Sequence, residues 1–278
     1  KLISIGVGDL YIRANYQDFQ RYQPVDVAIA ADAEATLPAL IEAVNMAIPA
    51  GRRAAIAQRG EDAKRAQASA RQRTLAAAAA TAWNASPISS ARLAAELWAQ
   101  IRTEDWALVS RDQSLSNWPH RLWNFEHYHQ FIGGPGGQGI GYGLPAAVGA
   151  GLAHRDQGRL AINLQNDGDC MYAPGALWTA AHHSVPLLTV MFNNRAYHQE
   201  VMHMQRMASW RQRGMENAHV GTVIRNPDIN FAQVAQGLGV EGIGPVENPN
   251  DLAAAIRRGI EVAKSGQPAL IDVVTQPR

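Results

Sequence analysis

The clearest pattern in the chain is a pair of apolar runs separated by one helix-length segment. Residues 160–164 and 185–192 are predominantly apolar, and each run ends at a polar break, at residues 166–169 and 193–194. The segment between them, up to residue 183, has the length of one helix. Two apolar strands joined by a helix predict a parallel β–α–β unit. Ligands bind outside the carboxyl ends of parallel strands, so both polar breaks are predicted to meet at one site.

Similar patterns continue on both sides of this unit. Apolar residues at helical spacing and helix-end signals predict helices at residues 89–101, 142–154, 231–238 and 252–263. Buried strands are predicted at residues 106–110 and 268–274. A helix begins near residue 197, whereas residues 203–227 lack a clear period and are interpreted as a loop or broken helix. Residues 89–278 therefore predict an α/β fold with a doubly wound, mostly parallel sheet.

The first part of the chain has a different character. A strand already under way is predicted from residue 2, a second strand at residues 25–30, and then a helix opened by Asp32. Residues 49–87 are alanine-rich, with scattered Arg and Lys and few large apolar residues. Basic helices can contact RNA or membranes, but a solvated linker helix is the favoured interpretation of this segment.

Composition excludes several classes of function. The formal net charge is +1, so nothing points to nucleic acid or to an acidic membrane surface. No apolar run has the length of a membrane span, and from these residues we expect no signal peptide. A single cysteine, Cys170, excludes an internal disulfide and fits a cytoplasmic location; a small apolar filler is a better interpretation of it than a reactive thiol. Because the first residue is not Met, we expect a fragment, a processed chain or part of one.

The two polar breaks carry the chemistry of a metal-bound phosphate. Asp167 offers a carboxylate oxygen, Asn194 an amide oxygen, and the loop after it a backbone carbonyl near Ala196. Mg²⁺ prefers such oxygens and usually keeps substrate phosphates as further ligands. Gly168 allows close approach of the backbone to a phosphate, and the following helix, with Pro174 near its first turn, would direct free N–H groups towards it.

These residues also resemble a known motif. Asp167-Gly168 followed, after twenty-four residues, by Asn193-Asn194 is similar to the thiamine diphosphate (ThDP) motif of the acetolactate synthase, benzoylformate decarboxylase and pyruvate decarboxylase superfamily. One position differs, because Asn166 stands where the family has the first glycine of its Gly-Asp-Gly triplet. The resemblance implies ThDP and Mg²⁺ as cofactors, with metal ligands at Asp167, Asn194 and Ala196. It implies contact with the cofactor at Asn166, Asp167, Gly168, Asp169, Asn194 and Ala196.

A glycine-rich run at residues 133–147 supports the resemblance. So many glycines imply special backbone angles or close backbone approach. The run resembles the family segment that grips the aminopyrimidine ring, with Ile140 under the bend of the cofactor and the Gln138 carbonyl facing the 4′-amino group; Gly139 lies between them. In the loop after the strand at residues 106–110, the resemblance implies that Gln113 or Ser114 touches the diphosphate.

The resemblance also implies a domain organisation. Residues 1–48 resemble the end of the family's middle domain, residues 49–88 form a helical linker, and residues 89–278 form the diphosphate- and Mg-binding domain. Some family members hold FAD in the middle domain, but nothing in this short part supports a flavin. In the family a glutamate from a separate N-terminal pyrimidine-binding domain activates the cofactor. We therefore expect such a domain, in a longer chain or another subunit, and a homodimer or homotetramer.

The implied activity is that of a lyase or carboligase acting next to a carbonyl, on a 2-oxo acid, an aldehyde or a 2-hydroxyacyl compound. By resemblance, Gln199 and Glu200 point into the substrate pocket, and His198 is a further candidate proton donor. A favourable first-turn position explains Glu200 equally well. Two alternatives stay open: a non-catalytic cofactor-binding subunit that needs a partner, and a generic nucleotide-binding α/β domain.

Overall fold

The computed structural model describes residues 1–7, 24–80, 82–110, 117–134 and 139–277. These residues form two compact units, residues 1–70 and residues 71–278, whose boundary falls inside a long helix.

The first unit is small and exposes most of its apolar side chains. Strands β1 (Ile3–Gly6) and β2 (Val27–Ala30) pair in parallel, and α1 (Ala33–Ala47) follows. The Asp32 side chain caps α1 by accepting from the Ala35 N–H at 2.9 Å, which confirms the predicted helix start. The long helix α2 (Ala50–Ala80) then begins, within the alanine-rich segment for which a linker helix was expected. Its role as a linker stays a prediction.

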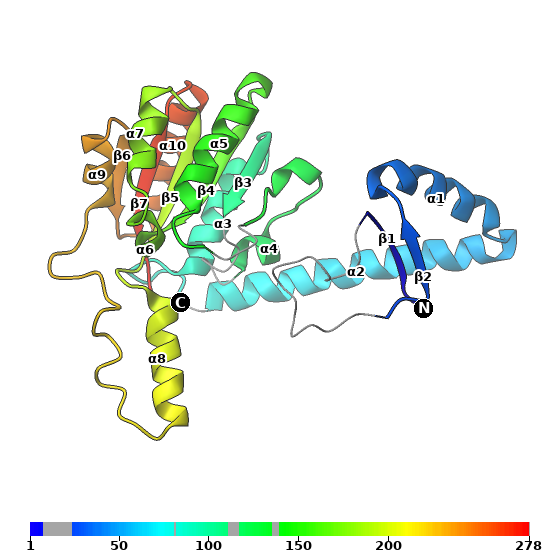
Figure 1. Cartoon of the computed structure of the whole chain (residues 1–278), viewed down its shortest axis with the longest axis horizontal. Coiled ribbons are helices and arrows are strands. Elements are labelled where there is room, and N and C mark those ends of the chain that lie inside the picture. The colour runs from blue at the N-terminus through cyan, green and yellow to red at the C-terminus, as the bar shows by residue number, and fades with distance from the viewer. Residues whose placement is uncertain (8–23, 81, 111–116, 135–138, 278) are drawn as a thin grey trace. The chain divides into compact units, whose positions relative to one another are not determined.

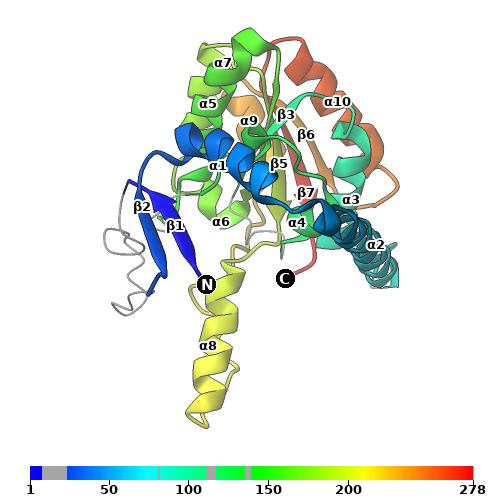
Figure 2. The same cartoon turned by 90° about the vertical axis from the view of Figure 1, so that its right-hand side faces the viewer.

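The second unit is built on a five-stranded parallel sheet in the order β3-β4-β5-β7-β6. Its strands are β3 (Trp106–Ser110), β4 (Leu160–Asn166), β5 (Leu187–Asn193), β6 (Glu241–Val246) and β7 (Ala269–Val274). Helices α3 (Ser90–Ile101) and α10 (Leu252–Lys264) cover one face, and α5 (Gly143–His154), α7 (Gly175–His182) and α9 (Phe231–Gly237) cover the other (Figures 1 and 2). The predicted doubly wound α/β fold is thus confirmed.

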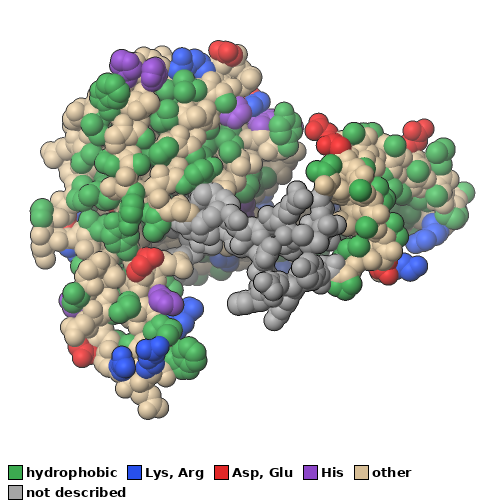
Figure 3. Space-filling view, viewed as in Figure 1, with side chains coloured by type: hydrophobic (Ala, Val, Ile, Leu, Met, Phe, Trp, Pro, Cys, Tyr) green, Lys and Arg blue, Asp and Glu red, His purple; other side chains and the backbone are tan. Residues whose placement is uncertain are grey.

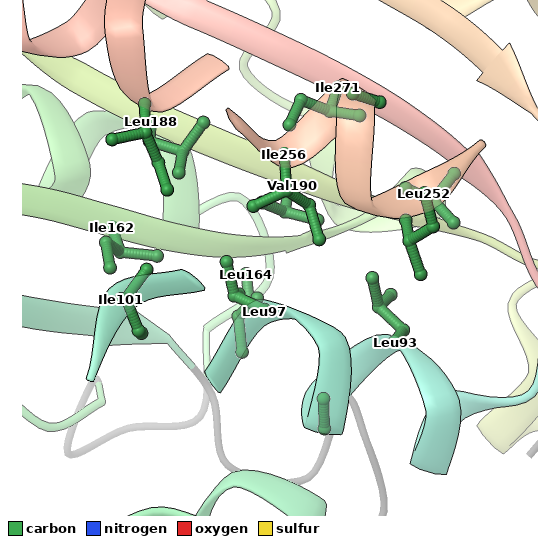
Figure 4. Packing of buried hydrophobic residues seen from close by; sticks show 14 of the residues in the cluster. Leu93, Leu97, Ile101, Ile162, Leu164, Leu188, Val190, Leu252, Ile256 and Ile271 are labelled. Atoms are coloured by element: carbon green, nitrogen blue, oxygen red, sulfur yellow. The ribbon is translucent and has the colours of Figure 1, made fainter. Parts of the chain in front are cut away.

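The core lies mainly between the sheet and the α3/α10 layer. Figure 4 shows side chains of the two helices meeting side chains of the central strands, among them Leu93, Leu97, Ile162, Val190 and Ile256. All five are fully buried. Each such side chain stabilises the fold by roughly 1.5–3 kcal/mol relative to an exposed position. This packing holds β4 and β5 rigidly side by side, and the site is built at their ends.

Two parts of the second unit differ from the sequence-based expectation. The segment 203–227 was expected to be a loop or broken helix. Residues 211–227 do form turns and loops, but α8 (His198–Trp210) continues unbroken to Trp210 and extends away from the sheet (Figures 1 and 2). Exposed apolar side chains on α8 and the segment after it include Met204, Trp210 and Met215. Figure 3 shows apolar side chains lying among charged ones in this part of the molecule. Strand β6 was not predicted at all, because two glycines and a proline conceal its pattern.

The remaining described elements are short. They are α4 (Trp118–Leu122), α6 (Asp167–Cys170) and the single 3₁₀ turns η1 (Tyr128–Gln130) and η2 (Arg155–Gln157). Among the described residues, no helix combines the length and the apolar character needed to cross a bilayer.

Candidate functional site

The two polar breaks meet at the carboxyl edge of the sheet. Strands β4 and β5 pair in parallel, with Asn166 in register with Phe192, so both strands end at the same level. Helix α6 begins immediately after β4 at Asp167, and Asn193 is the last residue of β5. The side chains that follow the two strands are therefore brought into contact.

Asp167 and Asn194 converge on a single backbone group. The Ala196 N–H donates to Asp167 Oδ2 at 3.1 Å and to Asn194 Oδ1 at 3.0 Å. The other carboxylate oxygen, Asp167 Oδ1, accepts from the Gly168 N–H at 2.8 Å. A carboxylate and an amide oxygen thus lie close together beside the Ala196 backbone, and such hard donors suit a Mg²⁺ ion.

Burial determines the protonation behaviour of Asp167. The Asp167 side chain is buried, and desolvation raises the pKa of its carboxyl group from 3.8 to about 6, although the backbone N–H donors at Gly168 and Ala196 oppose the shift. A nearby cation would favour the ionised form. The donor set and its poorly solvated charge therefore fit a divalent metal.

Asn193, the first residue of the Asn-Asn pair, has a structural role in this arrangement. Its Nδ2 donates to Asp272 Oδ1 at 3.0 Å, and Asp272 Oδ2 accepts from the Phe231 N–H at 2.9 Å. Asp272 lies fully buried on β7, and burial raises the pKa of its carboxyl group. The carboxylate joins the end of β5 to the start of α9. Sequence reasoning missed it, although an aspartate inside the apolar run at residues 269–274 was a visible signal.

Sequence reasoning also missed Arg195, which lies between the metal-ligand candidates Asn194 and Ala196 and shapes their loop. Its φ is 58°, the left-handed region that side chains rarely adopt. The guanidinium group forms ion pairs with Asp228 and Glu247, both at 3.1 Å. The Arg195 carbonyl accepts from the Ile224 N–H at 2.8 Å. This hydrogen bond joins the segment that follows α8 to the loop that precedes it. This conformation directs the following N–H, that of Ala196, towards Asp167.

Gly168 lies under an aromatic ring. A Cβ at this position would meet Cε1 of Tyr197 at 2.5 Å, so a side chain here would require the ring to move. Tyr197 in turn contacts Tyr172 edge-to-face, with ring centroids 6.4 Å apart. Burial raises the pKa of the Tyr197 hydroxyl, helped by the neighbouring Tyr172 and Asp167. Asn166, at φ −81°, adopts an ordinary extended conformation that does not require the family's glycine.

The other predicted cofactor contacts are only partly described. Gln113, Ser114 and Gln138 lie outside the described residues. Gly139 and Ile140 are exposed and lie just before α5, and Ile140 is 46% exposed. Asp169 accepts hydrogen bonds from the backbone of residues 141 and 143, which joins this segment to the end of β4.

The candidate catalytic residues lie at the start of α8. His198 and Gln199 occupy the first two positions of the helix, and the Glu200 N–H donates to the Tyr197 carbonyl at 3.0 Å. Glu200 is exposed in this chain. These residues therefore follow the metal-ligand candidates directly, while their contacts with a substrate stay a prediction.

Cys170 is a structural residue. It is fully buried, and desolvation raises the pKa of its thiol to about 12. The thiolate needed for nucleophilic chemistry is therefore absent at neutral pH.

Comparison with known proteins identifies the family. The sequence model described as "Thiamine pyrophosphate enzyme, C-terminal TPP binding domain" matches residues 114–273, more than half of the chain. IlvX of Mycobacterium tuberculosis, named among acetolactate synthase large subunits, is 36% identical over 138 residues, which cover 50% of this chain and 25% of that protein. Benzoylformate decarboxylase of Pseudomonas aeruginosa is 31% identical over 142 residues, covering 51% of this chain and 24% of that enzyme.

Solved structures agree with this assignment. The ThDP-dependent 4-hydroxybenzoylformate decarboxylase of Rhodococcus jostii RHA1 superposes with a TM-score of 0.58 at 28% identity, covering 70% of this chain and 34% of that one. The matched part of the chain is thus about a quarter to a third of the length of these relatives. The chain belongs to the thiamine pyrophosphate enzymes of the acetolactate synthase and decarboxylase group, through their C-terminal TPP-binding domain.

Proposed function

We propose that the chain binds ThDP through a Mg²⁺ ion held by Asp167, Asn194 and the backbone carbonyl of Ala196. The convergence of the two side-chain oxygens on one N–H is the observation that supports this most directly. Gly168 and Asn166 would line the diphosphate, together with Gln113 or Ser114. Gln138, Gly139 and Ile140 would hold the pyrimidine side of the cofactor.

The proposed reaction is cleavage or formation of a carbon–carbon bond next to a carbonyl, in a 2-oxo acid, aldehyde or 2-hydroxyacyl compound. When bound, ThDP supplies the nucleophilic carbon and the electron sink for such chemistry. Glu200 would exchange a proton with the substrate, while Gln199 and His198 orient it or assist the transfer. The names of the relatives, which include decarboxylases and acetolactate synthases, support this reaction class.

Activity is proposed to need an N-terminal pyrimidine-binding domain, either in a longer form of the chain or in another subunit. Residues 1–48 would then be the end of a middle domain and residues 49–88 a linker, in a cytoplasmic homodimer or homotetramer. The short share of each relative that the chain covers supports this organisation. It also favours a second candidate function, a cofactor-binding subunit without activity of its own.

Calorimetric titration with ThDP, with and without Mg²⁺, tests the cofactor site. The chain is titrated in the assembly in which it is isolated, and the native mass of that assembly shows whether a pyrimidine-binding domain is present. We expect Mg²⁺-dependent binding that weakens about a hundredfold or more in Asp167→Asn, which keeps the side-chain size but removes the metal's charged ligand. Asp156→Asn, at an exposed aspartate beyond α5, is the matched control. Absence of binding in an assembly that contains the pyrimidine-binding domain would contradict the proposal.

Steady-state kinetics test the proposed role of Glu200. We expect Glu200→Gln to lower kcat about a hundredfold with little change in KM, because a positioned proton donor typically contributes 10²–10⁴ to the rate. Glu216→Gln, at an exposed glutamate beyond α8, should leave kcat unchanged. A lower melting temperature with unchanged kcat would instead assign Glu200 to stabilisation of the first turn of α8.

A further inference from the structure

Asp169 uses its carboxylate differently from Asp167, although the two residues share one short helix. Asp169 Oδ1 accepts from the Gly141 N–H at 2.7 Å, and Oδ2 accepts from the Gly143 N–H at 3.3 Å. Oδ2 also accepts from Gln165 Nε2 at 2.7 Å. The carboxylate therefore accepts hydrogen bonds from two backbone groups of the glycine-rich segment and from one side chain of β4.

A chain of buried amides supports this carboxylate from inside the sheet. Asn163 Nδ2 donates to Gln165 Oε1 at 2.9 Å, which leaves Gln165 Nε2 to donate to Asp169 and, at 3.2 Å, to the Asn166 carbonyl. Asn163 and Gln165 are 0% and 1% exposed, on a central strand whose other buried residues are apolar. Burying two amides is unfavourable unless they are hydrogen-bonded, and Asn163 Oδ1 has no partner within the described residues. A purely structural strand would be expected to carry apolar residues here.

The glycine-rich segment is fitted closely against these groups. A Cβ at Gly143 would meet Gln165 Oε1 at 2.4 Å and Asp169 Oδ2 at 2.9 Å. Gly141 has a φ of 90°, and a Cβ there would meet the Cβ of Tyr172 at 2.9 Å. A side chain at either glycine would have to displace these groups, so the two glycines allow both N–H groups to reach the carboxylate.

We propose that Asp169, oriented by Gln165 and Asn163, is a positioning residue that fixes the turn at residues 139–143. Through this turn it sets the place of Ile140 and so the fit of the pyrimidine end of ThDP, without itself contacting the diphosphate. This inference rests on the proposed function for its ligand, while the anchoring of the turn is a property of the chain alone. It replaces the direct cofactor contact that the sequence motif implies for Asp169.

Two ligands separate positioning from direct contact. Calorimetry at saturating Mg²⁺ compares ThDP with inorganic pyrophosphate, which carries the diphosphate but no pyrimidine. Asp169→Asn is expected to weaken ThDP binding about tenfold or more and to change pyrophosphate binding by less than about twofold, because the charged acceptor that is lost binds two backbone N–H groups of the turn at residues 139–143. Asp156→Asn is again the control.

Hydrogen exchange provides a readout that needs no ligand. In Asp169→Asn the peptide covering residues 139–144 should exchange faster, because the new amide opposes one of its donors. The double variant Asp169→Asn/Gln165→Glu lets the new amide donate to a carboxylate while its oxygen accepts from the Gly141 N–H. The Gly143 N–H still faces the amide, so this variant should recover part of the ThDP affinity and part of the slow exchange. A merely destabilised fold would not be rescued in this way.

The outcomes are distinct. Equal loss of ThDP and pyrophosphate binding would overturn the proposal and assign Asp169 to the diphosphate. Unchanged ThDP affinity with unchanged exchange would overturn it as well. If the unmodified protein binds neither ligand with Mg²⁺, the proposed function fails and the cofactor part of this inference fails with it, whereas faster exchange in Asp169→Asn would still establish the anchoring of the turn.

Discussion

The carboxyl group of Asp167 is deeply buried and lies beside the amide oxygen of Asn194. Its raised pKa means that the folded protein binds a proton at this carboxyl group more tightly than the unfolded chain does. The stability contributed by the protonated form is fully present below the ordinary value of 3.8 and is lost as the pH rises through about 6. At neutral pH the metal-free fold therefore carries an unfavourable buried charge, which a cation would relieve.

In the absence of metal, the buried Asp167 carboxyl group should make the stability of the fold depend on pH. Between pH 4 and pH 7 the wild-type free energy of unfolding should fall by up to about 3 kcal/mol through this group, since a shift of about two pKa units corresponds to that energy. The side chain in Asp167→Asn cannot ionise, so the free energy of unfolding of this variant should lack this part of the fall with pH. Urea unfolding in the presence of a chelator measures both curves, and Mg²⁺ should restore the wild-type stability above pH 6. Parallel curves would mean that Asp167 does not titrate in this range.

The sequence predicted those contacts of the site that depend on chain spacing. Asp167, Asn194 and Ala196 follow adjacent parallel strands, so the β–α–β pattern alone brought them together. The partners of Asn193 and Asp169 were not predicted, because Asp272 is 79 residues from Asn193 and Gly141 is 28 residues from Asp169. Such pairings depend on strand order and on the path of a loop, which apolar periodicity does not encode.

Strand β6 shows how tertiary contacts can override local preference. Its sequence contains Gly242, Gly244 and Pro245, which disfavour a strand. It nevertheless pairs with β7, with an irregularity between Ile243 and Val246, and it lies at the edge of the sheet. Gly242 is needed because α9 lies directly against the strand: a Cβ there would meet the Ala232 carbonyl oxygen at 2.0 Å. The close contact between the backbones of β6 and α9 thus requires a glycine, and this glycine makes the strand hard to predict from sequence.

Two glycine substitutions test this packing. Gly242→Ala should destabilise the protein by about 2–3 kcal/mol, because a backbone atom rather than a flexible side chain must move. Gly237→Ala, at the last residue of α9, has nothing within 4 Å of the added Cβ and should stabilise the helix by roughly 0.5 kcal/mol. Denaturant midpoints of the two variants provide the comparison. Similar midpoints would show that β6 can separate from α9 without loss.

The two units of the chain differ in how completely their apolar side chains are buried. Among the residues that the structure describes, the core clusters all belong to residues 71–278, whereas α1 of the first unit buries no residue. Three apolar side chains at helical spacing lie on one face of α1. They are Leu37, Ile41 and Val44, which are 46%, 59% and 49% exposed. A helix with such an apolar face is normally packed against another element. This uncovered face is consistent with the proposal that residues 1–48 are the end of a larger domain.

Hydrogen exchange tests whether this first unit needs a partner. Helix α3, which buries five residues, serves as the matched control for α1. In the dissociated chain, α1 amides should exchange at least about a hundredfold faster than α3 amides, because local opening of an unpacked helix requires little free energy. In the native assembly, a covering domain should slow exchange in α1 and leave α3 unchanged. Slow exchange of α1 in the dissociated chain would show that residues 1–70 are stable alone, and the middle-domain assignment would lose its support.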